Sequence, residues 1–449
     1  MEKSIFFATG LSLLGAVCIA VLLSDSKPAP IYKAKPIPAW IEQLASDDYR
    51  TREEAAGVLH VLGSETTPWL IRALRQQDSI VRRVRPWLEQ RLPFLRLKQR
   101  PPAALVRERV AEQLGLIAGN DPTVIHALIC SLAETNRDVL SEIQRALRRA
   151  APRCVPEMIE ALSSRNCLLR EGAAQVLLDL GHDVPEAIPA LIRGLKDKDC
   201  VVRYRAAKAL GFAEGGGANV ISALSTALED PTANVRMTAA ESLGELGTVA
   251  RPAAAALKQT LSDPDSEVRV SAAKALWQIQ GNPAQVLPTL IGTLSEPATA
   301  WQTCFVLGEI GAPAAPAIPG LIEALKHEHI ARPLRSPPSS AFALGRIGSA
   351  AVPALIPLLT DPRPWVRTGA ALALGFIGES AKASVPALAL RLKDKEIEVR
   401  QASALSLGTI DPLTRELAPA LVELTRDEDI FVSSAALTAL RKIEATDHQ

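Results

Sequence analysis

An internal repeat of 33 residues constrains the fold of this chain more than any other feature of its sequence. The segments LKDKDCVVRYRAAKALG (195–211), LEDPTANVRMTAAESLG (228–244) and LSDPDSEVRVSAAKALW (261–277) align without gaps. The same period returns between residues 361 and 427, again with one aspartate in each unit. Self-similarity at such a period indicates small structural units that are stacked one on another.

Each unit is predicted to contain two helices. The first is short and begins beside a proline, as in AIPALIRGL (187–195) and AVPALIPLL (351–359), where the missing N–H costs little. The second follows an aspartate-containing turn and has apolar residues three and four positions apart, which places them on one face. Alanine and leucine are abundant and only 4% of residues are aromatic, which favours helices packed on helices over a β-sheet.

Two glycines recur at the end of the second helix, in the pattern L-G-x-[IL]-G. We expect the second glycine to end the helix in a left-handed conformation. The first glycine lies inside the helix, where it costs about 1 kcal/mol relative to alanine, so we expect a neighbouring helix to approach closely there. The pattern occurs at 243–247, 307–311, 344–348 and 374–378.

A single pair of such helices cannot bury its apolar faces alone, whereas stacked pairs share one continuous core. We therefore predict an all-α fold, a right-handed α-solenoid (an alpha-alpha superhelix) of roughly twelve helix pairs. The array is expected to occupy residues 37–445.

An aspartate and an arginine recur in register in the turn of each unit. We expect the aspartate to accept hydrogen bonds from free N–H groups at the next helix start, and the arginine to reach an aspartate of its own or an adjacent repeat. The result would be a structural ladder along one ridge, the alternative being direct binding of a ligand. The ladder residues are Asp197, Arg203, Asp230, Arg236, Asp263, Arg269, Asp361, Arg367, Asp394 and Arg400.

The motif V-R-x-x-A-A-x-x-L-G after D-P, with a proline-led first helix, resembles the HEAT-like repeats named after phycobilisome lyases. The resemblance covers residues 37–445. It implies the superhelical fold but little about activity, because that family includes scaffolds, adaptors, bilin lyases and a di-iron hydroxylase. The segment IYKAKPIPAWIEQL also resembles the connection between the hydrophobic helix and the repeats in exported bacterial HEAT-repeat proteins, where a glycine is usual at the position of Ala34.

The N-terminus stands apart from the repeats. Residues 5–23 contain no charge, and as a helix they are long enough to cross a hydrocarbon core of about 30 Å. We predict a short tail at 1–4, a transmembrane signal anchor at 5–23 and a tether rich in proline and lysine at 24–36. The resemblance to exported proteins places the solenoid on the extracytoplasmic, periplasmic side, whereas the lysines that follow the run, counted by the positive-inside rule, would keep it inside. A cleaved signal peptide, which would give a secreted protein, is the alternative.

Two irregular insertions interrupt the repeat, the first of them at residues 80–104. Basic side chains outnumber acidic ones there, and aromatic residues are interleaved with them. This region is a candidate site for an anionic surface, such as lipid headgroups, nucleic acid or an acidic protein, unless it is only a solvated insertion. The candidate residues are Arg82, Arg83, Arg85, Trp87, Arg91, Arg96, Lys98 and Arg100.

The second insertion lies at residues 330–340. The unit before it has lost the V-R pair, and the segment RPLRSPP (332–338) lengthens the turn inside the next unit. Insertions in solenoids gather on one face, which is often the binding face, although tolerated loop variation would look the same. The candidate residues are Trp301, His327, His329, Arg332 and Arg335.

The sequence carries no convincing catalytic, cofactor-binding or metal-binding motif. The pattern His327-Glu328-His329 occurs once, whereas the related di-iron hydroxylase uses His-Glu pairs on several repeats. The cysteines form no C-x-x-C motif, and apart from Cys18 in the predicted anchor we expect all of them to be small core residues. These are Cys130, Cys154, Cys167, Cys200 and Cys304.

These observations predict a non-catalytic, membrane-anchored scaffold or adaptor that binds a protein or peptide partner on its solenoid surface. A bilin-lyase-like or oxidoreductase enzyme is one alternative. A binder of anionic lipid or nucleic acid through residues 72–109 is the other, although a net charge of +1 argues against nucleic acid as the main partner.

Overall fold

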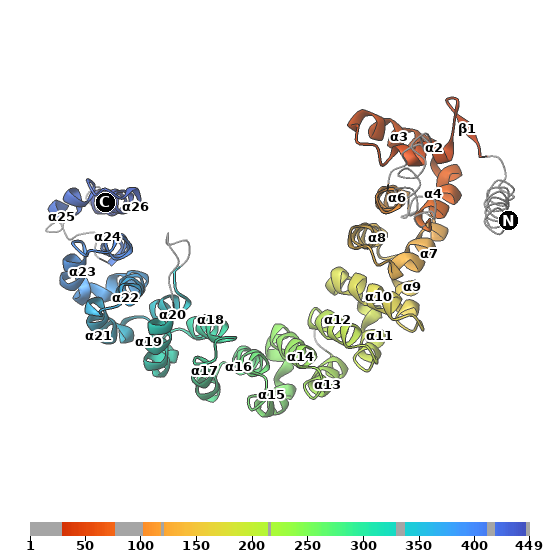
Figure 1. The fold of residues 1–449 in the computed structure, drawn as a ribbon. Coiled ribbons are helices and arrows are strands. Elements are labelled where there is room, and N and C mark those ends of the chain that lie inside the picture. Colours follow the sequence, from red (N-terminus) through yellow and green to blue (C-terminus); the bar gives the residue numbers. More distant parts are fainter. Residues whose placement is uncertain are drawn as a thin grey trace, which may run out of the picture. The chain divides into compact units, whose positions relative to one another are not determined.

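The structure, a computed structural model, describes residues 29–76, 102–117, 121–213, 217–328, 337–410 and 418–445. It divides into two compact units, Met1–Ala187 and Ile188–Gln449. Figure 1 shows the ribbon, coloured along the sequence.

In both units the described residues form pairs of helices that are consecutive in the chain and in contact, here called the first and the second helix of a pair. Unit 1 holds the pairs α2 (Ile37–Gln43) and α3 (Tyr49–Leu62), α4 (Thr67–Leu74) and α6 (Ala103–Ile117), α7 (Pro122–Cys130) and α8 (Arg137–Arg149), and α9 (Val155–Ala161) and α10 (Cys167–Leu180). The predicted start of the array at residue 37 coincides with the first residue of α2.

Unit 2 continues the same pattern to Ala445. Its pairs are α11 (Ile188–Gly194) and α12 (Cys200–Gly211), α13 (Ala218–Ala227) and α14 (Ala233–Glu245), α15 (Ala254–Thr260) and α16 (Ser266–Gln280), α17 (Leu287–Thr293) and α18 (Ala300–Ile310), α19 (Ile318–His327) and α20 (Ser339–Ile347), α21 (Val352–Leu355) and α22 (Pro364–Ile377), α23 (Val385–Arg391) and α24 (Ile397–Ile410), and α25 (Ala418–Leu424) and α26 (Ile430–Ala445). Together with unit 1 this makes twelve pairs within the described residues.

Short 3₁₀ turns lead into or extend several first helices. They are η1 (Gly63–Thr66), η2 (Ser131–Ala133), η3 (Gly181–Asp183), η4 (Pro185–Ala187), η5 (Gly247–Ala253), η6 (Pro283–Gln285), η7 (Ala312–Ala317), η8 (Ser349–Ala351), η9 (Ile356–Thr360) and η10 (Gly378–Ser384). The predicted proline at the helix start is confirmed in most first helices, including α2, α4, α7, α9, α17, α19, α21 and α23.

Within unit 2 the second helices pack side by side and the first helices cover one flank of that row (Figure 1). The leucine that precedes the first glycine of each repeat points into the core between the two layers. Leu243, Leu307, Leu344 and Leu374 are all fully buried. The predicted shared helical core is therefore confirmed for this unit.

The glycines inside the second helices allow close approach, as predicted. A Cβ atom at Gly408 would lie 2.7 Å from the Cα atom of Ala439 in α26. The glycines that end these helices have positive φ, for example 71° at Gly311, but ψ there is −138°. The prediction of a left-handed helical stop is therefore wrong in ψ at Gly311, Gly348 and Gly378, where the backbone turns into an extended form that glycine tolerates. Gly281, at the end of α16, does take the left-handed conformation.

The described end of the predicted tether is not a simple extended chain. Strands β1 (Ile31–Tyr32) and β2 (Lys35–Pro36) pair antiparallel, so the chain is not strictly all-α. The two turn residues have positive φ, 47° at Lys33 and 62° at Ala34, which is the backbone of a tight hairpin that favours glycine. The indole of Trp40 donates to the carbonyl of Tyr32 at 3.1 Å, and this bond fixes the hairpin to α2.

The boundaries of both predicted insertions need correction. Ala103 and Ala104 belong to α6, which packs against α4 as its second helix, so the first insertion falls inside a helix pair. Ser339 and Ser340 belong to α20. Residues 77–101 and 329–336, which make up most of the two insertions, lie outside the described residues.

The predicted anchor at residues 5–23 also lies outside the described residues. Among the helices that the structure does describe, no single one is both long and apolar enough to cross a membrane. The bent pair Ser339–Ile347 and Ser349–Thr360, with an angle of 112°, reaches that length and composition only when its two halves are joined.

Candidate interaction surface

Exposed phenylalanines lie on three consecutive second helices of unit 2. Phe305 of α18 is 45% exposed, Phe342 of α20 is 38% exposed and Phe376 of α22 is 46% exposed. The rings of Phe342 and Phe376 meet edge to face, with 6.1 Å between their centroids and 73° between their planes. Large aromatic side chains are usually buried in folded proteins. A row of three exposed phenylalanines is therefore unusual for a helix face that only contacts solvent.

The row rests on the repeat glycines. The ring of Phe342 lies 3.5 Å from the position that a Cβ atom of Gly308 would take. A Cβ atom at Gly345 would overlap the Cβ atom of Phe376. Each of these aromatic residues therefore lies against the backbone of the preceding second helix, which holds it in place while its outer face stays in contact with solvent.

Charged groups border the row. The ammonium group of Lys274 on α16 lies 5.4 Å from the ring centroid of Phe305 and 3.4 Å from the carboxylate of Glu309. Arg346 is exposed one turn after Phe342 on α20. An apolar strip with such a polar border has the composition of a protein interaction site.

One predicted site residue joins this row. Trp301 lies in the first turn of α18 and is 64% exposed. It stands four residues before Phe305, so the two side chains share one face of the helix. Trp301, Phe305, Phe342 and Phe376 together form the aromatic row.

The other residues of the second predicted site do not join the row. His327 ends α19, a first helix, where its exposed imidazole lies 3.3 Å from the carboxylate of Glu323. His329, Arg332 and Arg335 lie outside the described residues.

Glu328 has a structural partner at the start of α20. One carboxylate oxygen accepts from the backbone N–H of Ser339 at 2.9 Å and from its hydroxyl at 2.6 Å. The other accepts from the backbone N–H of Ser340 at 3.3 Å and from its hydroxyl. The residue between the two histidines of the H-E-H pattern thus closes the turn between α19 and α20.

All eight residues of the first predicted site, Arg82 to Arg100, lie outside the described residues. Two basic residues next to it are engaged with acids. Arg107 donates to the carboxylate of Glu134 at 3.0 Å and to the carbonyl of Gln76 at 2.9 Å. Arg109 lies 3.3 Å from the carboxylate of Glu112.

The ladder arginines each connect two repeats. Arg203 donates twice to the carboxylate of Asp230 in the next repeat, at 2.6 and 3.0 Å, and once to the carbonyl of Asp197 in its own turn at 2.9 Å. The carboxylate partner is therefore always in the adjacent repeat, and the residue of the same turn offers its carbonyl. The same pattern joins Arg236 to Asp263, Arg367 to Asp394 and Arg400 to Asp427, while Arg269 reaches Glu296.

The ladder aspartates accept from a backbone N–H at the next helix start, as expected, but this N–H belongs to the residue just before the helix and not to the helix itself. Asp263 accepts from the N–H of Asp265 at 2.9 Å, and Asp265 is the residue that caps α16 through Glu267 and Val268. Burial raises the pKa of the Asp263 carboxyl, but the hydrogen bonds from Arg236 and from the Asp265 amide outweigh it and hold this pKa below its ordinary value.

The ladder stops where the aromatic row begins. Each ladder arginine stands seven residues before the core leucine of its helix, as Arg269 does before Leu276. In α18 that position is Ala300, and in the next unit it is Pro337. These two repeats, which lack the arginine, carry Trp301, Phe305 and Phe342.

The cysteine prediction is wrong for three of five residues. Cys154 and Cys304 are buried, and burial raises the pKa of the Cys304 thiol to about 12. Cys130, Cys167 and Cys200 are exposed. Cys167 and Cys200 are the first residues of α10 and α12, so their side chains lie before the apolar residues that face the core.

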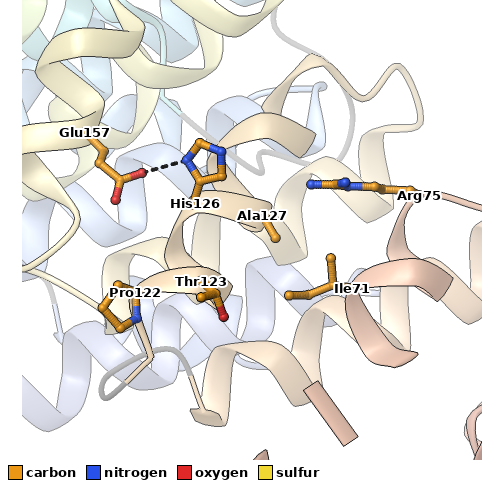
Figure 2. Close-up of a pocket in the computed structure, with 7 residues that line it drawn as sticks. All are labelled: Ile71, Arg75, Pro122, Thr123, His126, Ala127 and Glu157. Carbon is orange, nitrogen blue, oxygen red and sulfur yellow. Dashed lines mark hydrogen bonds and ion pairs between the residues drawn. The ribbon is translucent and has the colours of Figure 1, made fainter. Parts of the chain in front are cut away.

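Unit 1 contains a shallow cavity of about 430 Å³ between the first helices α4, α7 and α9 (Figure 2). It is lined by Ile71, Arg75, Pro122, Thr123, His126, Ala127 and Glu157. The imidazole Nδ1 of His126 lies 3.2 Å from a carboxylate oxygen of Glu157.

Comparison with known proteins identifies the repeats. The sequence pattern of HEAT repeats matches residues 128–211, 155–244, 188–277, 253–335 and 339–408, which together exceed half of the chain. Among curated proteins no match is found.

Solved structures of similar fold include importin beta, with 15% identity over 91% of this chain and 55% of that one and a TM-score of 0.58. Kap95p with RanGDP shows 13% identity over 91% of this chain and 55% of that one, with a TM-score of 0.57. Kap121p bound to RanGTP shows 17% identity over 92% of this chain and 48% of that one, with a TM-score of 0.54. This chain thus spans about half the length of these helical solenoids. The chain belongs to the family of HEAT-repeat proteins.

Proposed function

We propose that this chain is a non-catalytic scaffold that binds a protein or peptide partner through the aromatic row. The single observation that carries this proposal is the exposure of Phe305, Phe342 and Phe376 on three neighbouring helices. Contiguous exposed apolar surface marks interaction sites in soluble domains, and aromatic residues supply much of the binding energy at such sites.

The partner would present apolar side chains to the rings and polar groups to the border. Lys274, Glu309 and Arg346 supply both signs of charge along that border, which would set the orientation of the partner more than its affinity. The likeness to Kap121p, solved bound to Nup53p, supports a binding role at the level of the fold.

Site-specific photo-crosslinking tests this proposal. A benzoylphenylalanine at position 342 should capture a partner in the native cell, whereas the same group at Leu390 should not. Leu390 is a matched control because it is 68% exposed but lies on α23, a first helix. Equal yields from both positions would argue against a binding surface on the second helices.

Affinity for the captured partner gives the second measurement. We expect Phe342→Ala and Phe376→Ala each to weaken binding about tenfold, which corresponds to about 1.4 kcal/mol. Leu390→Ala should leave the affinity unchanged. An unchanged affinity in both phenylalanine variants would reject the aromatic row as the binding site.

We further propose that residues 5–23 tie this scaffold to a membrane, with the repeats on the extracytoplasmic side as in the exported bacterial proteins that the sequence resembles. The support is the uncharged run in the sequence and its length. The full chain should stay with membranes after alkaline extraction, and its repeats should be digested by protease added from the extracytoplasmic side. Release by alkali would contradict the anchor.

A further inference from the structure

A thiol, an imidazole and a carboxylate stand in line on the outer surface of unit 1. His126 and Cys130 are four residues apart on α7, and both are exposed. The Sγ atom of Cys130 lies 3.5 Å from Nε2 of His126, and Nδ1 of the same ring lies 3.2 Å from Oε2 of Glu157 on α9. Figure 2 shows His126 and Glu157 turned toward each other at the edge of the cavity.

This is the order of groups that nucleophilic side chains use. In the tautomer with its proton on Nδ1, His126 donates to the carboxylate of Glu157, and the lone pair of Nε2 then faces the thiol of Cys130. A base within reach of a nucleophile, oriented in turn by a third group, is the arrangement that prepares a side chain for covalent chemistry. Because the imidazole is 67% exposed and Cys130 is also exposed, a reagent in solution can reach the sulfur.

The neighbouring cavity is lined by charges of both signs, Arg75 and Glu157; because the Glu157 carboxylate faces His126, Arg75 is the group that can attract a reagent with negative charge. Arg75 lines it from the end of α4, opposite His126 (Figure 2). Its guanidinium would attract a carboxylate that enters between α4 and α7. The apolar floor is formed by Ile71 and Ala127, which suits a small organic body behind that carboxylate.

We propose that Cys130 is a nucleophilic thiol that forms a mixed disulfide with a small disulfide bearing a carboxylate. In the reaction the thiol proton moves to Nε2 of His126 and the sulfur attacks one sulfur of the disulfide. The S–S bond breaks, and the leaving sulfur takes the electron pair and then the proton from His126. Cys130 is thereby oxidised to the mixed disulfide and one thiol is released. This proposal is independent of partner binding by the aromatic row.

Peptide-level mass spectrometry of the full chain tests it, with dithiobis(nitrobenzoate) as the anionic disulfide and dithiodipyridine as the neutral one. Cys167 and Cys200 are internal controls, since they are also exposed and experience the same reagent. At neutral pH we expect Cys130 to react at least about tenfold faster than either control, because the imidazole beside it can take the thiol proton as the sulfur attacks.

Substitutions separate activation from simple exposure. His126→Gln should lower the rate at Cys130 to that of the controls, and Glu157→Gln should lower it in part. Glu160→Gln, an exposed residue on the same helix α9, should change nothing. Arg75→Gln should slow the anionic disulfide and leave the neutral one unaffected. A rate at Cys130 equal to those of Cys167 and Cys200, or one that His126→Gln does not change, would overturn the proposal.

Discussion

Arg367 and Asp394 form the most deeply buried rung of the ladder. They stand 27 residues apart, and two hydrogen bonds of 2.9 and 2.7 Å join their side chains. Only 6% and 4% of these side chains are exposed. Arg367 also donates to the carbonyl of Asp361 at 2.9 Å, so one guanidinium fixes the turn of its own repeat and the position of the next repeat.

Removing one partner of this rung should destabilise unit 2 strongly. Asp394→Ala leaves a buried guanidinium without its carboxylate, and such a change costs about 3–5 kcal/mol. Urea denaturation and hydrogen exchange at α22 and α24 would measure the loss. Glu379→Ala is the control, because its ion pair with Lys382 is exposed and should contribute little. Equal effects of the two substitutions would show that the rung does not carry stability.

The ladder should also make the protein sensitive to acid. Burial raises the pKa of Asp230, Asp263 and Asp394, but hydrogen bonds from the partner arginine and a backbone amide outweigh it, so each pKa lies below its ordinary value. At Asp427 the bond from Arg400 is the largest cause of the same lowering. The folded state therefore binds protons less readily than the unfolded state.

The sign of the pH dependence follows from this. The stability from these carboxylates is fully present above the ordinary aspartate pKa of about 3.9 and is lost as the pH falls through their lowered values. The melting temperature should therefore fall steeply below about pH 4. A variant with asparagine at all four positions should have a lower melting temperature at neutral pH and a shallower decline. An unchanged slope would contradict a role for the ladder in acid unfolding.

Two helical glycines should respond to alanine with opposite signs. At Gly408 the new Cβ atom would lie 2.7 Å from the Cα atom of Ala439, so α24 and α26 must separate and the protein should lose stability. At Gly57 in α3 no atom lies within 4 Å of that position, so Gly57→Ala should gain up to about 1 kcal/mol from helix propensity. Thermal melting of both variants measures this difference, and a stabilising Gly408→Ala would show that close approach is not needed there.

Much of the fold follows from local signals. The prolines mark the first helices, and the period places both the ladder and the core leucines, so α2 begins where the sequence predicts. The period does not predict the rung between Arg107 and Glu134. Its two residues are 27 positions apart like those of every other rung, but the insertion before α6 separates Arg107 from its own turn at Gln76.

Exposure is harder to derive from the repeat, because it depends on which helices cover a given face. Phe305 and Phe342 each stand two residues before a core leucine, whereas Phe376 stands two residues after one. Their shared surface appears only once α18, α20 and α22 are packed together. His126 and Glu157 come from neighbouring pairs in the same way, 31 residues apart, so no local motif indicates their contact.

Glu328 gives the last prediction, because it replaces the missing ladder at the start of α20. Its carboxylate accepts from the backbone N–H groups of Ser339 and Ser340, which have no acceptor inside the helix. Glu328→Ala should leave both donors unsatisfied, at a cost of about 1–2 kcal/mol, and speed hydrogen exchange of the α20 amides about tenfold. Glu323→Ala, on the exposed side of α19, is the control. If the α20 amides exchange at the same rate in both variants, other contacts hold the turn and Glu328 does not.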